Sequence, residues 1–371
     1  MNNLRVAFVG CGGIAEHYIK VYRDLPWVEL VCCMDADLAR AARAVELLAQ
    51  GALSKPPARA TDDFNEALQD DIDLVVINTP NHLHREQALA SFAANKHLLL
   101  QKPIAATVED ARSIAVAAAR AQQRGIISGL YMSYFDQPLM YDLRAMVEAG
   151  WFGQIVSLTG RLMHRGGLRI AQQVQEGQAN WRASLAQTGG GCFIQHAVHY
   201  VHLFEWLTNA RVVRVMAMTN NLACPGIEGE DIACALLELS NGALATLETA
   251  WTTAGETLAL RGTRGTAEYL NNQTLWLESA HGAYEGHVVR YAAAESNSTP
   301  GAPAASTPMQ QRTVHAPRLD DLNNPFNQHL QFIEAVRDLT APFVSIASGL
   351  NDMHVVNAVY ESARTGQAIN L

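Results

Sequence analysis

The feature that most constrains the fold is a glycine-rich turn between a short apolar segment and a helical one. Residues 4–9, LRVAFV, form the apolar segment, and GCGGIA follows at residues 10–15. Gly10 can make the tight turn after a strand, Gly12 lets the backbone approach a pyrophosphate, and Ala15 permits close packing of the next helix. The N-terminus of such a helix stabilises phosphate charge. The pattern predicts a dinucleotide site whose contacts are Gly10, Gly12, Gly13 and Ile14.

A second apolar segment ends in an acidic residue that favours one form of the dinucleotide. The segment VELVCCMD ends at Asp35, at about the twenty-residue spacing that this motif requires. The carboxylate can accept hydrogen bonds from both hydroxyls of the adenosine ribose and repels a 2′-phosphate. Ala36 and Asp37 follow, and neither offers a positive charge to that phosphate. We therefore expect the cofactor to be NAD rather than NADP.

Helices and strands then alternate along the chain. Helices are expected at 37–51, 84–96 and 107–124, and strands at 73–80, 97–103 and 125–132. This alternation predicts an α/β Rossmann domain, a doubly wound parallel sheet, over residues 1–127. The ligand should lie at the carboxyl ends of the strands, where Asn78–Pro80 and Gln101–Pro103 fall.

From about residue 128 strands follow one another with few helices. Helices are expected at 140–150 and 189–207, and strands at 155–165, 210–220, 231–240, 243–252, 256–262, 265–271 and 274–279. Asn241-Gly242 is a strong hairpin signal. We predict an α+β domain with an antiparallel sheet over residues 128–371. Its Ala-, Ser- and Pro-rich stretch at 292–318 is expected to be a solvated loop, and its last helix, 349–365, to pack back on the first domain.

The composition excludes several classes of partner. The 371 residues carry a net charge of −9, which argues against a nucleic-acid or anionic-membrane partner. No apolar run is long enough to span a membrane, and the N-terminus lacks the pattern of a signal peptide. The six cysteines show no metal-binding spacing. We expect a cytoplasmic protein with reduced thiols.

Two short segments stand out at the strand ends, Thr79-Pro80-Asn81-His82-Leu83-His84 and Gln101-Lys102-Pro103. They resemble the TPN-x-x-H motif and the Glu-Lys-Pro strand end of the glucose–fructose oxidoreductase / inositol dehydrogenase / MocA (Gfo/Idh/MocA) family. GGGCFIQHAVHYVHLFEWL at 189–207 is similar to its GG-x-L-x-D-x-G-x-H segment, and 325–371 to its C-terminal end. The resemblance implies a large open sheet whose free face forms a homodimer or homotetramer. It also implies cofactor contacts by Thr79, Pro80, Asn81, His84, Gln101 and Lys102.

The resemblance implies that His199 is the general base and that Lys102 serves in acid–base work or in substrate positioning. The ordinary pKa of lysine, about 10.4, must be lowered by cofactor charge and burial, whereas histidine titrates near working pH. Gln195 replaces the usual Asp, so it can orient a hydroxyl but cannot take its proton. Substrate contacts are expected from Gln195, Trp181, Arg182, Tyr131 and His164. The stretch MHRGGLR, which also holds Arg165 and Arg169, is otherwise expected to be a mobile surface loop.

Residues 189–207 contain three histidines, His196, His199 and His202, which could in principle bind a metal ion. His196 and His202 are six residues apart, about 600° around a helix, so they lie well apart on its circumference. No acidic residue shares the face of His199. We expect no metal, and structural roles for His196 and His202.

Three hypotheses about function remain open. The leading one is an NAD-dependent oxidoreductase acting on a hydroxyl of a sugar, cyclitol or glycoside. The second is an NAD-dependent redox glycosidase, which oxidises a ring hydroxyl transiently, eliminates the glycoside, adds water and returns the hydride; Gln101 and Gln195 keep it open. The third is a non-catalytic NAD-binding sensor, which the presence of Lys102 and His199 disfavours.

Overall fold

The computed structural model describes residues 3–51, 53, 55–279, 283–292 and 309–371. Contacts within this part of the chain define two compact units. Unit 1 comprises Met1–Asp136, Ala186–Gly189 and Pro317–Met353, and unit 2 comprises Gln137–Leu185, Gly190–Ala316 and His354–Leu371. The helix α10, Ile346–Thr365, begins in the first unit and ends in the second.

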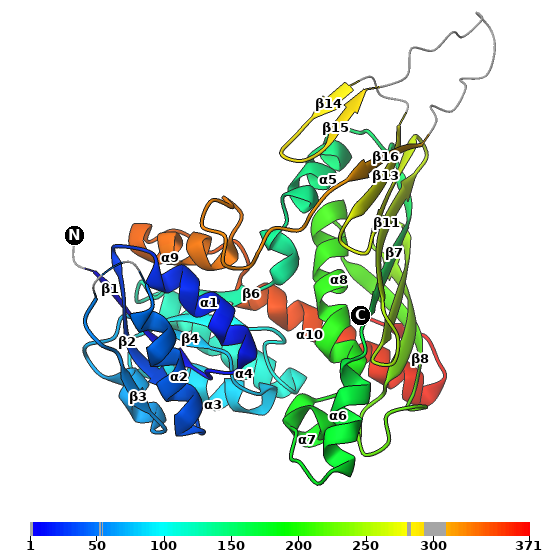
Figure 1. Cartoon of the computed structure of the whole chain (residues 1–371). Helices are drawn as coiled ribbons and strands as arrows, with labels where there is room; N and C mark the ends of the chain where they lie inside the picture. Colours follow the sequence, from blue (N-terminus) through cyan, green and yellow to red (C-terminus); the bar gives the residue numbers. More distant parts are fainter. Residues whose placement is uncertain (1–2, 52, 54, 280–282, 293–308) are drawn as a thin grey trace, which may run out of the picture. The chain divides into compact units, whose positions relative to one another are not determined.

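Unit 1 is built on a parallel sheet of six strands in the order β3-β2-β1-β4-β5-β6 (Figure 1). The strands are β1 Leu4–Val9, β2 Val28–Met34, β3 Arg59–Thr61, β4 Leu74–Ile77, β5 His97–Gln101 and β6 Ser128–Tyr131. The strand order reverses between β1 and β4, as in a doubly wound fold, so the predicted Rossmann class is confirmed.

Helices connect the strands of this sheet and supply its apolar cover. They are α1 Gly13–Arg23, α2 Leu38–Ala49, α3 His84–Ala93 and α4 Val108–Gln122, with the short helices η1 Phe64–Leu68, η2 Asn81–Leu83 and η3 Ser133–Asp136. Helix α9, Gln328–Asp338, joins them from the far end of the sequence. Phe332 and Ile333 of α9 pack with Tyr18 and Tyr22 of α1 in one core.

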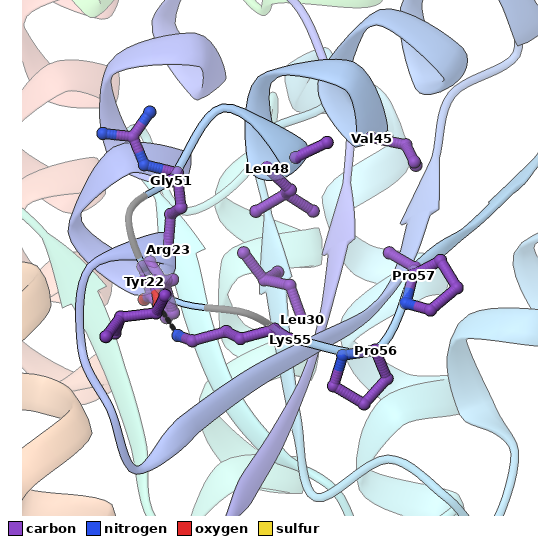
Figure 2. Close-up of a pocket in the computed structure, with 12 residues that line it drawn as sticks. Tyr22, Arg23, Leu30, Val45, Leu48, Gly51, Lys55, Pro56 and Pro57 are labelled. Atoms are coloured by element: carbon purple, nitrogen blue, oxygen red, sulfur yellow. Dashed lines mark hydrogen bonds between the residues drawn. The ribbon is translucent and has the colours of Figure 1, made fainter.

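A cavity of about 390 Å³ opens beside the amino end of β2 (Figure 2). Lys55 reaches into it, and its Nζ donates to the carbonyl oxygens of Tyr22, Leu25 and Val28 over 3.1, 2.6 and 2.8 Å. The three N–H donors of this ammonium group are therefore all used. The cavity lies at the opposite end of β2 from Asp35, so it is not the predicted cofactor site.

Unit 2 contains a nine-stranded sheet in the order β16-β13-β12-β11-β7-β10-β9-β8-β17. The strands are β7 Ile155–Met163, β8 Val212–Asn220, β9 Ile232–Leu239, β10 Leu244–Ala250, β11 Gly255–Gly262, β12 Gly265–Leu270, β13 Thr274–Ser279, β16 Gln310–Thr313 and β17 Ile369–Asn370. All neighbours are antiparallel except β10 and β7. The predicted open, mostly antiparallel sheet is confirmed, with the expected turn at Gly242, whose φ is +86°.

The helices of unit 2 and a small hairpin complete this unit. The helices are α5 Pro138–Glu148, α6 Gly166–Gln175, the short η4 Trp181–Ala183, and α8 Cys192–Thr208; α7, Leu185–Thr188, links the two units along the chain. The hairpin pairs β14 Ala283–Glu285 with β15 Arg290–Ala292. Helix α8 packs on one face of the sheet, where a Cβ at Gly160 would lie 2.6 Å from the ring of Tyr200.

The opposite face of the sheet exposes apolar side chains on β8, β9 and β10, namely Met216, Met218, Leu236 and Leu244. Trp251, by contrast, is buried, with 1% of its surface exposed. It follows the last residue of β10 and packs against α6, because Gly167 lets the helix approach it closely.

Two expected loops contain regular structure. The stretch MHRGGLR opens α6 rather than forming a loop, because Ile170 and Ala171 give the segment a buried helical face. Residues 310–313 of the expected loop form β16, which pairs with β13. Residues 293–308 of that loop lie outside the described part of the chain. Over the described residues, no helix is long and apolar enough to cross a membrane, and all six cysteines are free thiols.

Candidate functional site

The glycine-rich turn has the geometry of a dinucleotide cradle. Gly10 has a φ of +87°, and a Cβ there would lie 2.8 Å from the carbonyl carbon of Asn78, so this position requires glycine. Gly12 has an ordinary φ of −71° and no atom within 4 Å of where its Cβ would be. The fold itself therefore does not need glycine at position 12. The space beside it, at the N-terminus of α1, fits a pyrophosphate.

Asp35 lies at the carboxyl end of β2 with its carboxylate already oriented. Its Oδ2 accepts from the backbone N–H of Cys11 over 2.8 Å, and its Oδ1 accepts from that of Asp37 over 2.9 Å. A carboxylate offers about four acceptor sites, so each oxygen keeps capacity for a ribose hydroxyl. Asp35 thus links the glycine-rich turn to the start of α2 and fits the expected ribose contact.

The carboxyl end of β4 brings further polar groups to the same edge of the sheet. Asn78 has a buried Nδ2 with no hydrogen-bond partner among the described residues, which leaves a donor available to a ligand. Thr79 and Pro80 follow it, and Thr79 Oγ1 donates to Oε1 of Gln87 over 2.6 Å. Asn81 Nδ2 donates to the carbonyl of Thr188 over 2.8 Å, so its amide holds the segment that precedes the triglycine.

His84 lies fully buried behind this edge rather than facing it. Its Nε2 is 2.9 Å from the carbonyl oxygen of Thr79, and its Nδ1 is 3.0 Å from that of Pro103. Burial lowers the pKa of His84, and the two carbonyl oxygens oppose that shift. The expected direct contact of His84 with a cofactor does not agree with this geometry. The ring ties the end of β4 to the segment after β5, so its effect on the site is indirect.

Tyr131 is also buried, with 3% of its surface exposed, and does not offer its hydroxyl to a substrate as expected. Its Oη donates to Oδ2 of Asp136 over 2.5 Å, and its ring packs 4.7 Å from that of His329. Asp136 Oδ1 accepts from the backbone N–H of Gln328 over 2.6 Å. Burial raises the pKa of Asp136 to about 7 and lowers that of His329 to about 3. Sequence reasoning missed this network, because Asp136 and His329 are far apart in the chain.

Helix α8 carries the other expected site residues. Gln195, His196 and His199 are all buried, and His202 is half-buried. Trp251 Nε1 donates to Nε2 of His196 over 3.3 Å, so that nitrogen acts as an acceptor. His164 packs its ring 4.3 Å from that of His196, and its Nδ1 accepts from the backbone N–H of Gly166. His196 therefore belongs to a packed aromatic cluster, which fits its expected structural role.

Trp181 and Arg182 lie on η4, in the same unit as α8. The guanidinium of Arg182 stacks over the ring of Trp181 at 4.3 Å from its centroid. Arg182 is exposed. The stacked pair is attached to α6 through the hydrogen bond from Asn180 Nδ2 to Gln173 Oε1.

The described residues contain no group of three or more His, Cys, Asp or Glu side chains arranged to hold a metal ion. The expected cofactor contacts, including Lys102, belong to unit 1, and His199, Gln195, Trp181, Arg182 and His164 belong to unit 2.

Two family models match the chain. Residues 4–129 match an oxidoreductase family with an NAD-binding Rossmann fold, and residues 140–268 match the GFO/IDH/MocA C-terminal domain. The chain belongs to the Gfo/Idh/MocA family. Residues 4–129 are thus the NAD-binding Rossmann fold of that family, in agreement with the geometry of Gly10, Gly12 and Asp35.

Individual relatives of this Gfo/Idh/MocA protein act on carbohydrates. A 1,5-anhydro-D-fructose reductase of Ensifer adhaerens is 30% identical over 198 residues, 53% of this chain and 56% of the relative. An alpha-N-acetylgalactosaminidase of Shewanella oneidensis is 29% identical over 185 residues, 49% of this chain and 39% of the relative. These matches span about half or less of the relatives' length. A levoglucosan dehydrogenase, solved with NADH and levoglucosan, shares the fold with a TM-score of 0.80 at 19% identity, over 100% of this chain and 99% of that one.

One residue that differs from the family pattern, Gln101, makes two hydrogen bonds within unit 1. Gln101 stands where the family resemblance implies Glu, and its Nε2 donates to Oη of Tyr18 over 3.3 Å. Its Oε1 accepts from the backbone N–H of Lys102 over 3.0 Å. A carboxylate could not donate to Tyr18. The side-chain amide of Gln101 therefore holds the backbone N–H of Lys102 without placing a negative charge beside it.

Proposed function

We propose that this protein is an NAD-dependent oxidoreductase that acts on a hydroxyl of a sugar, cyclitol or glycoside. The observation that carries the proposal is the dinucleotide cradle, in which Asp35 is held by two backbone N–H groups beside open space at Gly12. Asp35 also supports NAD over NADP, because its carboxylate repels a 2′-phosphate. The carbohydrate substrate is supported by the reductase and levoglucosan dehydrogenase among the relatives.

The proposed roles follow from the chemistry of each side chain. When bound, NAD supplies the hydride acceptor. His199 takes the proton of the reacting hydroxyl, because a neutral imidazole is a competent base near pH 7. Lys102 holds that hydroxyl by donating a hydrogen bond, and Gln195 orients a neighbouring hydroxyl. Trp181 and Arg182 offer an aromatic face and donors to the sugar ring. The proposal requires Lys102 and His199 to reach the same substrate.

A second candidate is the redox glycosidase, in which the sugar is oxidised transiently and the aglycone is eliminated as the glycosidic bond breaks. The alpha-N-acetylgalactosaminidase among the relatives supports this second candidate. The two candidates share the cofactor cradle and differ in the product that is released.

One experiment distinguishes them. The purified protein is incubated with NAD and a panel of sugars and aryl glycosides, while NADH absorbance and aglycone release are both followed. Net NADH without aglycone supports the dehydrogenase, and aglycone without net NADH supports the glycosidase. NAD binding with neither product would overturn both in favour of a sensor.

Substitution on α8 tests the proposed base. His199→Ala should lower the activity by at least about 100-fold, as expected for removal of a general base. His202→Ala is the matched control, since this histidine lies three residues further along the same helix and is half-buried. Retained activity in His199→Ala would show that the base is another residue.

We also propose that the protein is a homo-oligomer, a dimer or tetramer, assembled through the open face of the nine-stranded sheet. The exposed apolar side chains of Met216, Met218, Leu236 and Leu244 support this. A group of apolar side chains on an exposed face often marks an interaction surface.

A further inference from the structure

The first turn of α8 is held by a single carboxylate from another segment of unit 2. Glu230 Oε2 accepts from the backbone N–H of Gly191 over 2.8 Å, and its Oε1 accepts from that of Phe193 over 2.8 Å. The backbone carbonyl of Glu230 accepts from Cys192 N–H over 2.9 Å. Glu230 thus satisfies three consecutive N–H groups where the helix begins.

Tyr360, on the part of α10 that belongs to unit 2, completes this arrangement. Its Oη accepts from the backbone N–H of Ile194 over 3.2 Å and donates to Oε1 of Glu230 over 3.0 Å. A helix leaves its first N–H groups without partners inside the helix. Here the groups from Gly191 to Ile194 all have acceptors, so the N-terminus of α8 has no donor left for a substrate anion.

The last two glycines of the triglycine, Gly190 and Gly191, are explained by this contact. A Cβ at Gly190 would lie 2.0 Å from Tyr360 Oη, and one at Gly191 would lie 2.0 Å from the carbonyl oxygen of Glu230. Gly229, on the facing segment, is equally restricted, since its Cβ would lie 2.7 Å from the Cα of Gly191. Glycine on both segments permits the approach that brings the carboxylate to the helix.

Glu230 is a buried carboxyl group whose two oxygens both accept hydrogen bonds. Only 7% of its surface is exposed, and the ion pairs of the described residues include none to Glu230. Burial raises its pKa, while the N–H donors and the Tyr360 hydroxyl oppose that shift. The positive end of the helix dipole also favours a carboxylate at this position. The hydrogen bonds to Glu230 therefore fix where α8 begins.

We propose that Glu230 and Tyr360 are positioning residues for Gln195 and His199, a role that rests on the proposed function of His199. Gln195 lies in the first turn that they hold, and His199 lies one turn further along the same side of α8. A helix transmits a shift of its first turn to the next, and a displacement of about 1 Å in a reacting group can cost about 100-fold in rate. Removing the hydrogen bonds from Glu230 and Tyr360 to the first turn of α8 should therefore change the reaction rate, although neither residue contacts substrate or cofactor in this proposal.

Two variants with a matched control test this inference. Glu230→Gln keeps the shape but directs an amide donor at a backbone N–H, and Tyr360→Phe removes only the hydroxyl. Glu205→Gln is the control, because Glu205 is a buried carboxylate near the other end of α8 that accepts from Val212 N–H over 2.9 Å. The NAD dissociation constant, kcat, KM and the NMR signal of the His199 ring are measured for each variant.

We expect Glu230→Gln and Tyr360→Phe to lower kcat by about 10- to 100-fold with a smaller change in KM and unchanged NAD binding. The His199 ring signal should shift in both variants. Glu205→Gln should leave kcat and that signal near wild type even if it unfolds more easily. Wild-type kcat and an unshifted His199 signal in a folded Glu230→Gln or Tyr360→Phe would overturn the positioning role.

Failure of the proposed function gives a different result. In that case the wild type turns over no carbohydrate, or His199→Ala retains its activity. The NMR comparison needs no turnover, so it still decides whether Glu230 and Tyr360 set the position of His199.

Discussion

The backbone N–H of Cys11 donates to Oδ2 of Asp35 over 2.8 Å, which ties the glycine-rich turn to the end of β2. Asp35→Asn keeps the shape but removes the charge and one acceptor. Because hydrogen bonds to charged groups contribute about 1.5–3 kcal/mol, we expect NAD binding to weaken about 10- to 100-fold. The preference for NAD over NADP should also fall, since the repulsion of a 2′-phosphate is lost. Titration of both cofactors measures these changes.

Asp37→Asn is the control for this experiment. Its carboxylate caps α2 by accepting from Ala39 N–H and pairs with Arg40, both at the surface. Exposed ion pairs contribute about 0–1 kcal/mol, so this variant should retain its cofactor preference. An unchanged NAD to NADP ratio in Asp35→Asn would refute the ribose assignment.

A substitution at Gly12 tests cofactor binding largely apart from folding, because the space beside this residue is open. No atom lies within 4 Å of where its Cβ would be, and its φ of −71° suits any residue, so Gly12→Ala should still fold. Its melting temperature should fall by only a few degrees, because Gly12 is the N-cap of α1, where alanine is less favourable than glycine. The added methyl would occupy the space proposed for the pyrophosphate, so NAD binding should weaken at least about 10-fold. Calorimetry without and with NAD measures both quantities.

Gly13→Ala tests the neighbouring position. Gly13 is the first residue of α1 and has equally open space, so its substitution favours the helix by up to about 1 kcal/mol. If Gly12→Ala folds and binds NAD as tightly as the wild type, then the cradle does not work as proposed.

Local patterns in the sequence predicted much of the fold. The apolar run of β1, the glycine-rich turn and Asp35 lie within 35 residues and report on one βαβ unit. Asn241-Gly242 is likewise a local signal, since the turn type depends on residues that allow a positive φ. The alternation of helices and strands was sufficient for the parallel sheet.

Contacts between distant segments were not predictable in this way. The carboxylate of Glu230 meets Phe193 N–H across 37 residues, and Tyr22 meets His329 across 307. Tyr131 was expected at a ligand because it ends a strand, but α9, which no local pattern indicated, supplies the His329 that packs against it. The functions of single polar residues depend on such partners, which periodicity does not encode.

The exposed sheet face predicts the effect of a charge on assembly. Leu236 lies on β9 with 57% of its surface exposed, and Met216 of β8 is its register partner. Leu236→Lys would place an ammonium group in the proposed interface, so we expect light scattering to show a monomer where the wild type is a dimer or tetramer. Val116→Lys, on α4 and 48% exposed, is the control and should leave the mass unchanged. A wild type that is monomeric at micromolar concentration would contradict the proposed assembly.

Asp136 predicts a pH dependence of stability. Its pKa is raised from 3.8 to about 7 by burial, so the folded protein keeps a proton that the unfolded chain loses above about pH 4. The contribution of this group is fully present below about pH 4 and is lost as the pH rises to about 7. Each pH unit within that window costs at most about 1.4 kcal/mol.

Asp136→Asn isolates this contribution because the amide resembles the protonated acid. Its Oδ1 can accept from Gln328 N–H, and its Nδ2 can donate to the hydroxyl of Tyr131. The neighbouring His329 stays neutral through the window, since burial lowers its pKa to about 3. The free energy of unfolding of the variant, relative to wild type, should therefore increase by a few kcal/mol between pH 4.5 and pH 7.5. Urea titrations at a series of pH values measure that difference, and a difference that does not change with pH would show that Asp136 is ionised throughout.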